Sequence, residues 1–180
     1  MWQATGSAQS TTVRTTCRCS SGSVPPKGYR HLLKRRDLEA FIALIPDWDE
    51  LSVGMSWIVL ARDTNYMGYH ERGLVAVCAW PAPLWHEDMC KDWYWEHADV
   101  LDRLGVDVWK DGPRWVAAWT EDQARAFQLL HVFLHEIGHH CDCVTTRTRR
   151  RAARGEGYAE AFAVELEERV WDDFVRTFPL

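Results

Sequence analysis

The sequence predicts a single domain of the α+β class, in which a small β-sheet packs on helices. Two runs of strand-forming residues lie in the first half of the chain, at 56–61 and 73–80, and a hairpin pattern follows at 106–119. The other hydrophobic residues recur largely at helical spacing, above all in the apolar run that starts near Ala124. A length of 180 residues suits one domain, and a hydrophobic content of 47% is enough for a sizeable core.

The first 26 residues differ in composition from the rest. They are rich in Ser, Thr and Gly, contain no acidic residue and end on Pro25-Pro26. Such a segment cannot bury enough apolar surface to offset the entropy that is lost on ordering. We therefore expect residues 1–26 to be a flexible tail and residues 27–180 to form the folded domain.

A helix is predicted over Tyr29–Ile45, because apolar residues recur every three or four positions and Pro46 ends the pattern. Its apolar positions are Leu32, Leu33, Leu38, Phe41, Ile42 and Ile45. The basic residues 34–36 are expected to form a solvated face of this helix, with nucleic-acid contact as the alternative.

The strand at 73–80 ends at Pro81, and Pro83 keeps it from continuing, which suits an edge strand. Residues 65–69, which separate it from the strand at 56–61, indicate a loop and a turn.

An aromatic segment, 85–95, then leads into a short predicted helix that contains Val100, Leu101 and Leu104. Two further strands, 106–109 and 114–119, flank Lys110-Asp111-Gly112-Pro113, and the pattern predicts a hairpin.

The central helix has a clear start signal in Thr120 and Gln123, which form a capping box. The residues behind this cap supply the apolar surface of a buried helix: Ala124, Phe127, Leu130, Val132, Phe133 and Leu134. A last helix is predicted from Glu156 to Phe174, with a stripe of Ala159, Phe162, Ala163, Leu166 and Val170.

The central helix also carries His135-Glu136-Ile137-Gly138-His139, an HExxH motif. Residues four apart lie on one face of a helix, so His135 and His139 can bind one metal ion. Glu136 can reach a water on that metal and act as a general base. We expect Gly138 to leave room beside the metal.

Catalytic zinc has three protein ligands and a water, so a third ligand is needed. Glu156 and Glu160 share one face of the last helix. We assign Glu156 as the third ligand and Glu160 as an acceptor that orients a ligand histidine. The alternatives are the reverse assignment, with Glu160 on the metal, and two solvated glutamates without a metal.

The two segments HEIGHHCD (135–142) and EGYAEAFA (156–163) resemble the motifs of gluzincin metallopeptidases. They are most similar to the pattern of the anthrax-lethal-factor-like zincin catalytic domain, over about residues 120–175. The resemblance implies zinc bound by His135, His139 and Glu156, with Glu136 as the base. It also implies supporting roles for Glu160 and Asp142. That family has a tyrosine seven residues before the glutamate ligand, where this chain has Arg149.

The resemblance further implies a minimal zincin-like fold, with a small sheet whose edge strand packs on the HExxH helix. The implied function is that of a zinc-dependent endopeptidase acting on a protein or peptide substrate. Such enzymes bind substrate along an edge strand by β-augmentation, and 73–80 is our candidate for that strand. The candidates for an oxyanion donor are Tyr158, His131 and His140. His131, one helical turn before His135, is expected to be a core histidine, with a metal ligand as the alternative.

Two other functions remain open. The chain can be a non-catalytic interaction module on a zincin scaffold, or a DNA-associated protease that uses the arginine-rich loop Arg147–Arg154. A solvated loop or recognition of an acidic peptide are further interpretations of these arginines. The net charge of −5 argues against a general nucleic-acid-binding surface.

No apolar run approaches the roughly 20 residues of a membrane span, and no signal peptide is visible. A cytoplasmic location or export by a non-classical route is therefore expected. The six cysteines are expected to be free thiols in a reducing compartment. A second, structural zinc site on the pairs Cys17/Cys19 and Cys141/Cys143 is the alternative.

Overall fold

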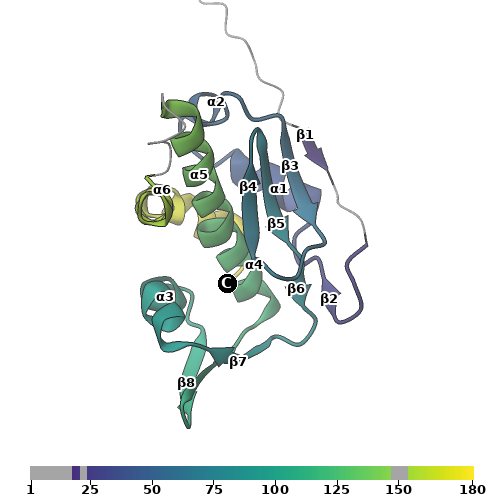
Figure 1. Ribbon diagram of the computed structural model, residues 1–180, viewed down its shortest axis with the longest axis vertical. Coiled ribbons are helices and arrows are strands. Elements are labelled where there is room, and N and C mark those ends of the chain that lie inside the picture. Colours follow the sequence, from purple (N-terminus) through teal and green to yellow (C-terminus); the bar gives the residue numbers. More distant parts are fainter. Residues whose placement is uncertain (1–17, 21–23, 147–153) are drawn as a thin grey trace, which may run out of the picture.

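The computed structural model describes residues 18–20, 24–146 and 154–180, and its fold is α+β. A four-stranded sheet has the order β1-β3-β5-β4 (Figure 1). Strands β1, β3 and β5 are parallel, and β4 pairs antiparallel with β5. The bounds are Arg18–Ser20 for β1, Trp57–Ala61 for β3, Gly68–Glu71 for β4 and Leu74–Cys78 for β5.

Strand β1 corrects the expectation of a flexible tail for part of that segment. Its backbone pairs with β3, and Cys19 packs against the core. Strand pairing uses backbone groups, so the low apolar content of the segment does not prevent it. Residues 1–17 and 21–23 lie outside the described residues.

The helix expected over 29–45 is shorter in the structure. Tyr29–Arg30 forms strand β2, which pairs with β6 (Trp80–Pro81), and helix α1 is Arg35–Ile42. Leu32 and Leu33 are buried from a segment that precedes the helix, so their contribution to the helical pattern was coincidental. A short helix, α2 (Trp48–Leu51), follows.

The strand predicted at 73–80 is present as β5, but its expected edge position is wrong. Strand β5 pairs on both sides, with β3 and with β4, and Val75–Cys78 are buried. A continuous run of buried apolar residues is typical of an inner strand, and the prolines beyond it only end the strand. The segment expected to be loop and turn instead leads into β4, which pairs with β5 alone among the described strands.

A second, three-stranded sheet has the order β7-β9-β8 and lies with helix α3 at the lower end of the molecule in Figure 1. Strands β8 (Asp107–Asp111) and β9 (Arg114–Ala118) form the predicted hairpin. The aromatic segment forms β7 (Trp85–Met89) and the start of α3 (Lys91–Arg103), which is longer than expected.

The central helical segment has three parts: α4 (Glu121–Phe127), a π-helix η1 (Gln128–Phe133) and α5 (Leu134–Thr145). The capping box is confirmed, because Thr120 Oγ1 accepts from the Gln123 N–H and Gln123 Oε1 accepts from the Thr120 N–H. The π-helix was not predicted. Wide turns of this kind inside α-helices are frequent at functional sites.

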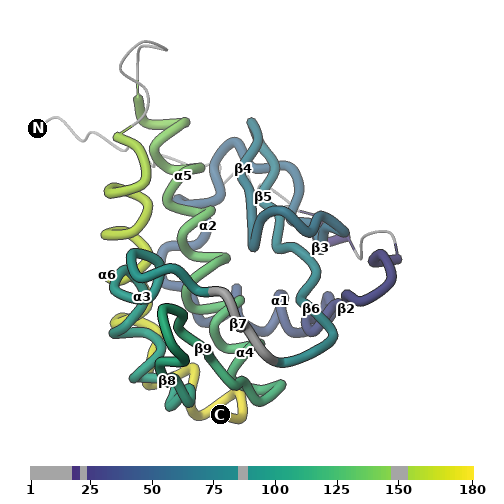
Figure 2. The backbone as a smooth tube through the Cα atoms, turned by 60° about the horizontal axis from the view of Figure 1, so that its bottom comes forward, coloured from purple at the N-terminus to yellow at the C-terminus, as the bar shows by residue number. Residues whose placement is uncertain are grey.

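Helix α6 (Glu156–Thr177) runs alongside α5, and the sheet lies on the opposite side of α5 (Figures 1 and 2). The two helices approach closely at Gly138: a Cβ atom there would lie 2.8 Å from the Ala159 Cα atom. The sequence predicted that Gly138 leaves room beside the metal. Its missing side chain instead makes room for α6. Among the described residues, no helix is long and apolar enough to cross a membrane.

Candidate metal centre

A cleft lies between strand β4 and helix α3, and residues of η1, α5 and α6 form its floor. It has a volume of about 460 Å³. Tyr66, Met67 and Gly68 line it on the side of the sheet, whereas Trp93, Glu96 and His97 line it on the side of α3. The motif residues His135 and Glu136, together with Glu156 and Glu160, lie on the floor.

Three ligand atoms converge at this floor. The Nε2 atoms of His135 and His139 are 3.1 Å apart, and Glu156 Oε2 lies 3.1 Å from the first and 3.3 Å from the second. The histidines come from successive turns of α5, and Glu156 is the first residue of α6. The Glu156 side chain is largely exposed, so this end of the cluster is open to solvent.

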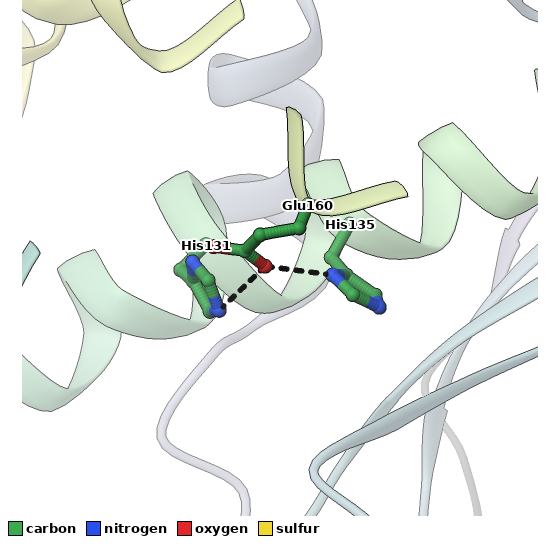
Figure 3. Close-up of side chains that lie close together, drawn as sticks. All are labelled: His131, His135 and Glu160. Carbon is green, nitrogen blue, oxygen red and sulfur yellow. Dashed lines mark hydrogen bonds and ion pairs between the residues drawn. The ribbon is translucent and has the colours of Figure 1, made fainter. Parts of the chain in front are cut away.

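The other nitrogen of His135 faces Glu160. His135 Nδ1 lies 3.2 Å from Glu160 Oε2, as the dashed line in Figure 3 marks. A carboxylate accepts hydrogen bonds, so Nδ1 donates to Glu160. Nε2 faces His139 and Glu156 and can bind a metal ion when it carries no proton. Burial alone would raise the pKa of Glu160, but the hydrogen bond from His135 and the charges of nearby histidines outweigh it and lower that pKa.

The field at the histidine pair favours a cation. Burial would lower the pKa of His135, yet the carboxylates of Glu160, Glu136 and Glu156 outweigh burial and raise it. The same negative field favours a bound metal ion.

Glu136 is buried beside this cluster, and burial raises its pKa to about 7. Strand β4 comes very close to it: a Cβ atom on Gly68 would lie 3.0 Å from Glu136 Cγ and 2.8 Å from Val132 Cγ1. Only a residue without a side chain lets the edge strand lie this close to α5. The general-base candidate is therefore enclosed by the backbone of β4.

Asp142 does not contact the histidines but holds the start of α6. Its carboxylate accepts from the Arg154 backbone N–H at 2.6 Å, from Arg154 Nε at 2.8 Å and from Thr146 Oγ1 at 2.8 Å. Arg154 also stacks on Tyr158, with its guanidinium carbon 3.6 Å from the ring centroid. Arg154 is two residues before Glu156, so this contact fixes where that glutamate begins its helix.

Replacing Asp142 by asparagine should weaken zinc binding about 10-fold, because the start of α6 is then held less firmly. The measurement is a competition titration with a chelator.

Burial would raise the pKa of Asp142, but its hydrogen bonds with Arg154 and Thr146 outweigh this and lower it. The contact is therefore complete at neutral pH and is lost only as the pH falls below about 4. Zinc affinity equal to that of the unmodified chain at pH 7 would contradict this role.

The three candidate oxyanion donors lie in different places. Tyr158 stacks with Arg154, and His140 is fully buried and donates from Nε2 to the Val53 carbonyl at 3.0 Å. His131 alone of the three lines the cleft, but its Nε2 is directed to Glu160.

The cysteines do not form the alternative zinc site among the described residues. The groups of three or more side chains that could hold a metal there contain only histidine and glutamate. Cys141 is buried and Cys143 is exposed on the same helix, whereas Cys17 lies outside the described residues. The described cysteines are free thiols, and burial raises the pKa of Cys78 to about 12.

Sequence reasoning missed the wall of the cleft that α3 contributes. Trp93 and His97 stack on each other with ring centroids 4.2 Å apart, and Glu96 lies between them in sequence. Their i, i+4 spacing on a helix was the available signal, but the helix was predicted to begin later. For Gly68 the sequence contains no signal of its role, because that role depends on the close approach of β4 to Glu136.

Searches of protein-family models, curated proteins and solved structures find no match to this chain.

Proposed function

We propose that this chain is a zinc-dependent metallopeptidase with a minimal zincin-like domain. The observation that carries the proposal is the triangle of His135 Nε2, His139 Nε2 and Glu156 Oε2, with sides of 3.1, 3.1 and 3.3 Å. A tetrahedral zinc ion with bonds of about 2.0–2.1 Å separates its ligand atoms by about 3.3 Å. The donor types, their number and their spacing fit zinc with one open position.

The chain's own residues would divide the chemistry as follows. Bound zinc would supply Lewis-acid polarisation of the scissile carbonyl and would lower the pKa of a water. Glu136 would take the proton from that water and pass it to the leaving amine. Glu160 would keep His135 in the tautomer that presents Nε2 to the metal. Strand β4, rather than the 73–80 segment, would bind an extended substrate by β-augmentation.

The charge of the cleft bears on the class of substrate. Its lining residues among the described part of the chain include four glutamates, Glu96, Glu136, Glu156 and Glu160, and no lysine or arginine. This supports neutral or basic peptides over acidic ones. Arg154 is already engaged by Asp142 and Tyr158, and Arg147, Arg149, Arg150 and Arg151 lie outside the described residues. The described residues therefore support neither a DNA contact nor the recognition of acidic peptides.

The decisive experiment combines metal analysis with peptide cleavage. We expect one zinc per purified chain and cleavage of a peptide library that chelation abolishes and added zinc restores. At free zinc of about 100 times the dissociation constant, chelation should also lower the free energy of unfolding by about 2.7 kcal/mol.

The matched variants are His139→Ala, which should lose zinc, and His31→Ala, which should keep it because His31 does not line the cleft. One zinc without cleavage of any peptide would instead indicate a non-catalytic module. Absence of zinc from the unmodified chain would refute the metal site.

A further inference from the structure

His131 is the most deeply buried ionisable side chain in the wall of the cleft, with 5% of its surface exposed. It lies on the π-helix η1, one turn before His135. Its ring packs on Phe127, with centroids 5.0 Å apart, and meets the edge of His97 at 4.6 Å. A polar ring held this firmly inside an aromatic cluster needs a reason beyond packing.

The reason lies in Glu160. Its Oε2 atom stands between two histidines, 3.2 Å from His135 Nδ1 and 3.7 Å from His131 Nε2 (Figure 3). The first contact is a hydrogen bond, and the second is an electrostatic contact slightly beyond hydrogen-bond length. One carboxylate oxygen thus joins the π-helix to the HExxH histidine.

The proton positions follow from the partners. Burial lowers the pKa of His131 to about 4, so the ring is neutral at pH 7 and has a single N–H. A lone pair facing a carboxylate would be repelled, so Nε2 carries that proton. His97 differs, because its Nδ1 already donates to the Trp93 carbonyl at 2.7 Å. Burial likewise lowers the pKa of His97, which leaves it no second proton for Glu160.

We propose that His131 is a positioning residue for the metal: it holds Glu160 in place, and Glu160 in turn orients the zinc ligand His135. The proposal rests on zinc binding at the site described under the proposed function. It assigns a role to a residue that does not touch the metal, the water or the substrate.

The expected effect follows from what happens to Glu160 without His131. The Glu160 side chain is 36% exposed, so a carboxylate released from one partner can turn to water. His135 then loses the acceptor that selects its tautomer. Loss of such an outer partner typically weakens metal binding by about 10–100-fold. Because His131 acts one step further away, we expect the lower end of that range.

The test uses three single variants of the full chain, with zinc affinity measured by chelator competition at pH 7. His131→Phe keeps an aromatic ring but removes the N–H, and should weaken zinc binding about 10-fold. His131→Gln restores an N–H at similar reach and should bind zinc within about 3-fold of the unmodified chain. His31→Phe is the matched control: His31 does not line the cleft, so zinc affinity should be unchanged. The melting temperature of each zinc-free variant shows that it is folded.

A double-mutant cycle with Glu160→Ala separates positioning from general destabilisation. In the Glu160→Ala background, His131→Phe should change zinc affinity by less than about 2-fold, because its route to the metal is gone. Full multiplication of the two single effects would overturn the proposal, and so would normal zinc affinity in folded His131→Phe. If the unmodified chain binds zinc but one of these two results is obtained, only the role of His131 is refuted, and the proposed metal site is not. No zinc binding at all overturns both proposals.

Discussion

Replacing Glu136 by glutamine is expected to reduce peptide hydrolysis about 10³-fold, while the protein still binds one zinc per chain. The amide has nearly the size of the carboxylate but cannot accept the proton from water, and proton transfer by a positioned base contributes about 10²–10⁴-fold. Zinc content should not change, because Glu136 does not belong to the triangle formed by His135, His139 and Glu156. Turnover of a library-derived peptide and metal analysis of the same sample measure the two quantities.

The matched control for this variant is Glu165→Gln, on the exposed surface of α6. It removes the same charge far from the cleft lining and should leave turnover within about 2-fold of the unmodified chain. A Glu136→Gln variant with more than about a tenth of the normal turnover would show that another group acts as the base.

Replacing Gly138 by alanine is expected to lower the free energy of unfolding by about 1 kcal/mol, although alanine favours helices. Alanine in a helix interior is better than glycine by about 1 kcal/mol. Against this, the new Cβ would lie 2.8 Å from Ala159 Cα and 3.0 Å from the Ala159 carbonyl oxygen. Both are backbone atoms, so α6 must move as a whole, and overpacking of this kind costs about 1–3 kcal/mol. Urea denaturation measures the change.

Gly157→Ala provides the matched control on the facing helix. No atom lies within 4 Å of a Cβ built there, so alanine should be neutral or stabilising by about 0.5 kcal/mol. If the two variants were equally stable, the close contact between α5 and α6 at Gly138 would not restrict the size of the side chain there. Zinc affinity of Gly138→Ala should fall as well, because movement of α6 displaces Glu156.

Local signals in the sequence correctly predicted the helices, and the helix cap, that carry the candidate site. The cap at Thr120, the helix that carries His135 and His139, and the helix that starts at Glu156 are all present. These features depend on residues within a few positions of one another, where capping and helical periodicity act directly. The ligand set remains a proposal, but the spacing did bring its three side chains together.

Features that depend on contacts between distant segments were not predictable. The edge strand beside the cleft is β4, because β5 pairs on both sides. The apolar run at 73–80 is typical of an inner strand, whereas the prolines after it favour an edge, and only the pairing within the sheet decides between the two. Leu32 and Leu33 completed a helical pattern although they are buried outside α1. The α3 wall of the cleft could not be predicted, because it depends on Trp93 and His97 packing on Phe127 and His131, which lie about 30 residues further along the chain.

The π-helix at Gln128–Phe133 has a consequence for comparing this chain with others. A wide turn holds about one residue more than an α-helical turn, which shifts the rotational phase of the helix by about 100°. Gln123 anchors the capped start of the helix to the carbonyls of Leu104 and Gly105. The histidine pair is therefore rotated about the helix axis, relative to this start, from where an unbroken α-helix would place it. A relative with an unbroken α-helix here would align with this chain only through a one-residue gap inside the apolar run. Sequence alignments that treat helix interiors as gap-free would misplace either the cap or the metal ligands.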